Sequence, residues 1–176
     1  PDKEVYLADL QDAINAAYTD PPALPLMPQT ISVSGGVPIS NPETNREVVL
    51  DLQIIQCLAP KASVIAFFYG DGNGAIVNAL AAAVMEEDVS VISWSDETFH
   101  AWDTRKTPEW AGFCRCLEFY GHVAACLGVT VCKGAGDDGA YPDSSSEGPS
   151  VFVLPSNPWV LSSGGVMLKE TPGGKA

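Results

Sequence analysis

The sequence has little positive charge. Of its 176 residues only 9 are Lys or Arg, against 22 Asp or Glu, which gives a formal net charge of −13. Nucleic acids and anionic membranes bind clustered Lys and Arg, so neither is expected as a partner. No apolar run is long enough to span a bilayer, and no basic, apolar N-terminal segment marks a signal peptide. The acidic balance is compatible with work at acid pH, where many carboxylates are protonated.

Motifs for metals and nucleotides are also missing. The five cysteines form no C-x-x-C, and the two histidines do not lie at zinc-ligand spacing from them, so no metal site is predicted. The glycines of residues 70–74 lack the G-x-G-x-x-G spacing that binds a pyrophosphate, and there is no P-loop. With 46% hydrophobic residues, the chain can form one sizeable core, which predicts a single domain over residues 1–176.

What is present is an alternation of helical and extended patterns. Buried apolar strands between helices are typical of an α/β fold with a mostly parallel sheet and helices on both faces. Chemistry in such folds gathers in the loops that leave the carboxyl ends of the strands, here residues 93–96 and 136–139. The predicted helices span residues 4–17, 45–60, 74–86 and 108–127, and the predicted strands residues 30–34, 62–68, 89–94, 129–133, 151–154 and 159–161.

The helix predicted at residues 45–60 carries two acids within its apolar arc. At about 100° per residue, Glu47 and Asp51 fall in that arc, and the predicted solvent face holds polar residues. Two carboxylates at i,i+4 repel each other, and partial burial raises the cost, so the pair is predicted to share protons. An alternative is that both acids lie near the dipole-positive end of the helix with Glu47 partly solvated. The predicted apolar arc comprises Val48, Leu52, Ile54, Ile55 and Leu58, and the predicted solvent face Arg46, Gln53 and Gln56.

Four segments in this order resemble the sedolisin family, serine-carboxyl peptidases with a subtilisin-like fold. They are E-x-x-x-D running into Ala-Pro (residues 47–60), S-V-I-S-W (90–94), L-G-V-T-V (127–131) and A-G-D with a following glycine (135–139). The resemblance extends from the first predicted helix to the Ser-Ser-Gly-Gly at residues 162–165. It implies a subtilisin-like fold that is incomplete in this chain.

The resemblance also implies roles for three acids. Glu47 matches the general base that takes the serine proton, and Asp51 matches the second acid that orients it. Asp137 matches the aspartate that must be protonated to donate a hydrogen bond to the oxyanion, which again indicates acid pH. The alternative for Asp137 is a turn residue selected for backbone geometry, and Asp138 is expected to be a solvated turn residue.

A substrate-binding strand is implied at Ser93, Trp94, Ser95 and Asp96, where relatives have S-W-G-G. Both glycines are replaced here, and glycine is what allows a peptide to approach a backbone closely. Tight substrate binding is therefore in question, and Trp94 is equally well explained as a core aromatic residue.

The nucleophile of the family lies in a downstream G-T-S motif, followed by a calcium-binding loop. Neither is present in these residues, nor is the first strand of the family fold, and no serine here has the G-T-S context. We therefore expect this chain to provide acids without the nucleophile, with calcium bound in the missing C-terminal part. The expected partner is a second chain, or a C-terminal part of the same precursor, that bears the serine.

Three hypotheses follow from the sequence. The first is part of an acid-acting serine-carboxyl endopeptidase, inactive alone, that cleaves peptide or protein substrates in an extracellular or acidic vacuolar or lysosomal compartment. The second is a catalytically inactive sedolisin-like structural or interaction module. The third, an unrelated flavodoxin-like or Rossmann-like binder, is weakened by the missing phosphate-binding motifs.

Overall fold

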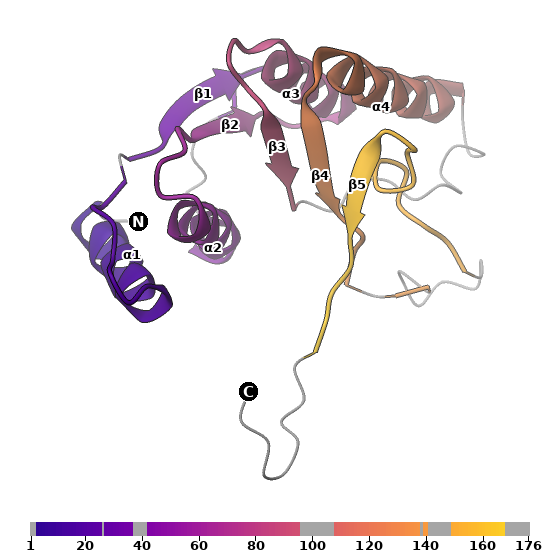
Figure 1. Cartoon of the computed structure of the whole chain (residues 1–176). Helices are drawn as coiled ribbons and strands as arrows, with labels where there is room; N and C mark the ends of the chain where they lie inside the picture. The colour runs from indigo at the N-terminus through magenta and orange to yellow at the C-terminus, as the bar shows by residue number, and fades with distance from the viewer. Residues whose placement is uncertain are drawn as a thin grey trace. The chain divides into compact units, whose positions relative to one another are not determined.

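The computed structural model describes residues 3–25, 27–36, 42–95, 108–137, 139–140 and 149–167. The chain divides into two compact units, Pro1–Ala79 and Leu80–Ala176. The first unit contains α1 (Lys3–Ala17), β1 (Gln29–Val33), α2 (Pro42–Leu58), β2 (Ile65–Tyr69) and the first half of α3 (Asn73–Met85). The second contains the end of α3, β3 (Val91–Trp94), α4 (Pro108–Leu127), β4 (Thr130–Gly134) and β5 (Val160–Ser163) (Figure 1).

All strand pairs among the described residues are parallel. In the first unit β1 pairs with β2, with Gln29 opposite Ile65. In the second unit the strand order is β3-β4-β5, with Val91 opposite Thr130 and Val131 opposite Val160. Parallel strands joined by helices confirm the predicted α/β class.

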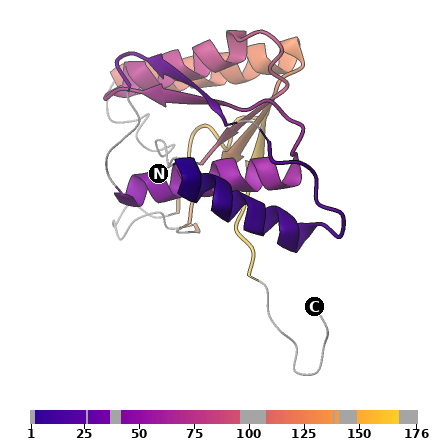
Figure 2. The ribbon, with the colours of Figure 1, turned by 90° about the vertical axis from the view of Figure 1, so that its left-hand side faces the viewer.

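The first unit has a core between two helices. Leu10 and Ile14 lie four residues apart on α1, so they share one face, and both are fully buried. With Tyr6 of α1 and Cys57 of α2 they form a cluster that packs the two helices together (Figure 2). This contact fixes which face of α2 points away from α1.

In the second unit α4 packs on β4. It begins at Pro108, where the missing N–H costs no hydrogen bond. It ends at Leu127 and is followed by Gly128, whose φ of 77° is the left-handed conformation of a helix C-cap. The N–H of Gly128 donates to Ala125 O at 3.2 Å and that of Val129 to Ala124 O at 2.8 Å, which is the Schellman pattern. The predicted bounds of this helix are confirmed.

The prediction of a strand at residues 151–154 is wrong. The segment forms turns after a single bridge residue at Phe152. Ser156 N donates to Phe152 O at 3.3 Å and Asn157 N to Leu154 O at 3.1 Å, so the chain folds back on itself. The segment is nevertheless buried, because Phe152 and Leu154 are part of the core. An apolar run alone does not distinguish a strand from a buried turn.

Candidate active-site acids

The two acids of α2 lie on the side of the helix that α1 does not cover. Glu47 is exposed and Asp51 is half-buried. Contrary to the prediction, part of the apolar arc around them is open, since Ile54 is 52% and Leu58 is 72% exposed. The predicted burial of Glu47 within that arc is therefore wrong, and the alternative in which Glu47 is solvated describes the structure better.

The face of α2 predicted to meet solvent is instead the face that meets α1. Gln56 is only 1% exposed, and the Tyr6 hydroxyl donates a hydrogen bond to its Oε1. Gln53 Nε2 donates to the Tyr6 carbonyl at 3.4 Å, and the Tyr18 hydroxyl donates to Cys57 O at 2.9 Å. Burial raises the pKa of Tyr6 above its ordinary value. Polar side chains thus contribute to this interface beside the apolar cluster, which a rule based on apolar periodicity does not anticipate.

The predicted substrate strand is β3. Ser93 is exposed, whereas Trp94 and Ser95 are half-buried, and Asp96 lies outside the described residues. Trp94 pairs with Lys133 of β4 in the register of the sheet. The carbonyl of Ser95 lies 3.7 Å from where a Cβ on Gly134 would sit, so the two strand ends remain close beyond the last pair.

Asp137 lies in the loop that follows β4, and it is exposed. The preceding residue, Gly136, has a φ of 94°, a conformation that favours glycine. A Cβ there would lie 2.3 Å from Cε2 of Phe152, because the aromatic ring packs directly on the glycine backbone. The turn geometry of the alternative interpretation is therefore present beside Asp137, and Asp138 lies outside the described residues.

The predicted site residues fall into two groups. Glu47 and Asp51 share one helix in the first unit. In the second unit, β3 ends with Ser93 and Trp94, and Ser95 comes directly after it. Asp137 lies in the loop that follows the neighbouring strand, β4. Because β3 and β4 are parallel and adjacent, these residues leave the same edge of the three-stranded sheet.

Sequence reasoning did not identify Lys133 as unusual. Its side chain is 1% exposed at the carboxyl end of β4, four residues before Asp137, and its Nζ lies 3.4 Å from Gly134 O. Lysine is seldom buried, because removing an ammonium from water is costly unless it is paired. The signal available in the sequence was a lysine inside an otherwise apolar strand.

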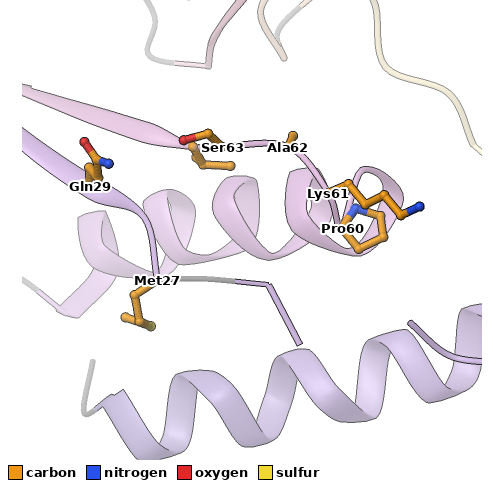
Figure 3. A pocket seen from close by; sticks show the side chains of 7 residues that line it. Met27, Gln29, Pro60, Lys61, Ala62 and Ser63 are labelled. Carbon is orange, nitrogen blue, oxygen red and sulfur yellow. The ribbon is translucent and has the colours of Figure 1, made fainter. Parts of the chain in front are cut away.

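Other candidate sites are sparse in the part of the chain that the structure describes. It contains no group of three or more His, Cys, Asp or Glu arranged to hold a metal ion, and no helix long and apolar enough to cross a membrane. A small hollow of about 190 Å³ lies where α2 ends and β2 begins, and none of the predicted site residues lines it (Figure 3). Its lining residues are Met27, Gln29, Pro60, Lys61, Ala62, Ser63 and Val64.

Comparison with known proteins supports the resemblance inferred from the motifs. No family model matches the chain. Kumamolisin from Bacillus sp. (strain MN-32) is 30% identical over 156 residues, which cover 83% of this chain and 27% of that protein. A structure of Pseudomonas sedolisin, a serine-carboxyl proteinase complexed with two molecules of pseudo-iodotyrostatin, superposes with a TM-score of 0.69 at 24% identity. The match covers 97% of this chain and 47% of the sedolisin chain, so the sedolisin-like fold is present only in part.

Proposed function

Because this chain is a relative of the sedolisin family, we propose that it supplies three acids to a serine-carboxyl endopeptidase that acts at acid pH. Glu47 is the general base, Asp51 orients it, and Asp137 stabilises the oxyanion. The nucleophilic serine comes from a segment or chain outside these residues, and a calcium ion is expected in that same part. The chain spans about a quarter of kumamolisin and about half of the sedolisin structure, which leaves room for such a part in the complete enzyme.

The observation that carries the proposal is the position of the two acids on α2. They lie one helical turn apart, on the side that α1 leaves open, with Glu47 exposed. An approaching hydroxyl can therefore reach the Glu47 carboxylate without any rearrangement of the α1–α2 core. Asp51 is less exposed and one turn further along, so it is placed to hydrogen-bond to Glu47 when one of the pair carries a proton.

The proposed chemistry is acyl transfer. The Glu47 carboxylate takes the proton of the serine hydroxyl while the serine oxygen attacks the peptide carbonyl carbon. The electron pair of the C=O bond moves to the oxygen, and protonated Asp137 donates a hydrogen bond to this oxyanion. Collapse of the intermediate expels the amine, which receives the proton from Glu47. An ionised base and a protonated Asp137 are needed together, and this requirement restricts the reaction to acid pH.

The substrate strand supports the alternative of an inactive interaction module. Ser95 stands where relatives have the first of two glycines, and its side chain is half-buried beside the carboxyl end of β3. A side chain at this position hinders close approach of a peptide backbone. A module without catalysis would keep the fold and lose acid-dependent cleavage altogether.

The test is peptide cleavage at acid pH by the complete protein, with its serine-bearing part present. Glu47→Gln removes the base with little change in size and is expected to lower kcat by about 10⁴-fold, as loss of a catalytic triad member does. Asp12→Asn removes another exposed carboxylate, on α1, and serves as the matched control, with activity unchanged. Cleavage by the Glu47→Gln protein at the wild-type rate would refute the assignment of the base. Absence of cleavage by the wild type at every pH would favour the inactive module.

A further inference from the structure

We propose that the outer edge of β1 pairs with the same edge of a second copy of this chain, strand against strand and antiparallel, so that the protein forms a two-fold symmetric dimer. The dimer does not depend on the proposed function, because its contact includes neither the acids of α2 nor Asp137. Three features support it, namely the direction of the backbone groups of β1, the lack of charge around them, and the fit of this edge to its own copy.

One edge of β1 is open. Among the described residues β1 pairs with β2 alone (Figure 1). The Gln29 N–H donates to Val64 O at 2.9 Å, and Val33 O accepts at 3.2 Å from the glycine that follows β2, so both residues direct these groups toward β2. Successive residues of a strand direct their backbone groups to alternate sides. The N–H and C=O of Thr30 and Ser32 therefore point to the outer edge.

The outer edge of β1 lacks the usual protection against the addition of another strand. Natural proteins protect an edge strand with lysine, proline or a bulge. Residues 29–33 contain neither lysine nor proline, their register with β2 has no bulge, and Thr30 and Ser32 are exposed. Residues 21–42 contain no Asp, Glu, Lys, Arg or His, although the whole chain has 22 acids. The described edge is thus an open and uncharged template for pairing.

The distribution of charge favours a second copy as the partner. Two chains of net charge −13 repel each other wherever their acids meet, so most contacts between copies are unfavourable. Residues 21–42 are an exception, because they bring no charge to a contact. A strongly charged partner gains no ion pair on this edge. An uncharged edge of the same length fits it best, and a second copy supplies one.

The sequence of β1 is self-complementary in an antiparallel register centred on Ile31. In that register Thr30 of one copy lies opposite Ser32 of the other, and each such pair exchanges both of its backbone hydrogen bonds. The hydroxyl side chains of the pair lie on the exposed face, where Thr–Ser pairs stabilise antiparallel strands. On the half-buried face Ile31 meets Ile31 of the other copy. The two sheets then join into one.

The first measurement is sedimentation of the protein produced from its complete coding sequence, over a range of concentrations. We expect a monomer–dimer equilibrium. Its dissociation constant should fall when NaCl is raised from about 50 mM to about 500 mM, because salt screens the repulsion between two acidic chains. A monomer at every concentration in both salts, or a dimer that weakens with salt, would overturn the proposal.

Ser32→Pro tests the edge itself. Proline is tolerated on an edge strand where the N–H faces outward, so the pairing with β2 is kept. The substitution removes one hydrogen bond from each copy, and each is worth about fivefold, so the dissociation constant should rise about thirtyfold. Ser32→Ala keeps the N–H and should stay within about twofold. Equal dissociation constants for the two variants would contradict strand pairing.

Thr30→Lys is a second test that keeps every backbone group and covers the case in which Ser32→Pro does not fold. The new lysines of the two copies approach each other diagonally across the axis and repel, so the dimer should weaken. Asn15→Lys adds the same charge to an exposed site of α1 and should not weaken it, since it lowers the net negative charge. A dimer that is equally strong in both variants would place the contact elsewhere.

A photoreactive benzophenone amino acid at Thr30 then identifies the contact. Copies that carry the probe are mixed with copies labelled with heavy nitrogen, so that crosslinks between copies differ in mass from crosslinks within one copy. We expect a crosslink between copies to the peptide that contains Ser32. A crosslink within one copy would show that another part of the same chain covers the edge. That result, or a crosslink to a different segment of the other copy, would overturn the proposal.

Discussion

Tyr6→Phe is expected to destabilise the first unit more than its small change in volume suggests. The Tyr6 hydroxyl donates to Oε1 of Gln56, a side chain that is 1% exposed, while Tyr6 itself is 2% exposed. Removing a donor from a buried acceptor costs about 1–3 kcal/mol, because this hydrogen bond is lost and no water replaces it. Tyr6→Phe should therefore lower the free energy of unfolding by that amount in urea denaturation at neutral pH.

The matched control is a hydrogen bond on the surface. Gln11 Nε2 donates to Asn15 Oδ1 at 2.9 Å on the exposed side of the same helix. Asn15→Ala removes this bond where water replaces it, so the change should stay within about 0.5 kcal/mol. The double variant Tyr6→Phe with Gln56→Leu removes both polar groups. Its loss in free energy of unfolding should be about 1 kcal/mol smaller than the sum of the losses in the two single variants. Equal effects of Tyr6→Phe and Asn15→Ala, or strict additivity in the double variant, would refute the reasoning.

Three further predictions concern turns, helix packing and alkaline pH. Gly136→Ala places a Cβ 2.3 Å from the Phe152 ring at a φ of 94°, so it should lower the free energy of unfolding in urea by about 1–3 kcal/mol. Gly139→Ala is the milder control, because its Cβ meets no atom within 4 Å. Gly121→Ala places a Cβ 2.6 Å from Nδ2 of Asn157, so it should lower the melting temperature despite the better helix propensity of alanine; a rise would contradict the packing. Because burial raises the pKa of Tyr6 above 10.0, the unfolded chain ionises first as pH rises, so stability is lost above about pH 10. Tyr6→Phe should lose less stability than the wild type between pH 9 and pH 11, values set by the ordinary tyrosine pKa of about 10.

The elements were largely predictable from the sequence because their signals are local. The proline and glycine that bound α4 predicted both of its ends. The helix α2 begins at Pro42, three residues before the predicted start at residue 45, and a proline suits the first turn of a helix. The parallel direction of the strands also followed, because buried apolar runs separated by helices form parallel sheets.

The orientation of α2 was not predictable, because it depends on a contact between distant residues. Gln56 is polar, and the pattern alone assigns it to solvent. It is buried because Tyr6, 50 residues earlier in the chain, places a hydroxyl opposite it. Residues 151–154 show the same limit, since their apolar side chains are buried in a turn rather than in a strand. The roles of Glu47, Asp51 and Asp137 come from the family resemblance and stay predictions until the variants are measured.

Asn157, which lies against Gly121, connects the irregular segment before β5 to α4. Asn157 Nδ2 donates to Glu118 O at 3.3 Å, and Asn157 Oδ1 accepts from the N–H of Trp159 at 3.0 Å, so one side chain joins the middle of α4 to the residue before β5. Segments joined in this way tend to open together in a single cooperative step. Backbone amides from Asn157 to Val160 should therefore exchange with solvent deuterium at the same rate as those of α4. The start of β5 should then open only when this helix opens.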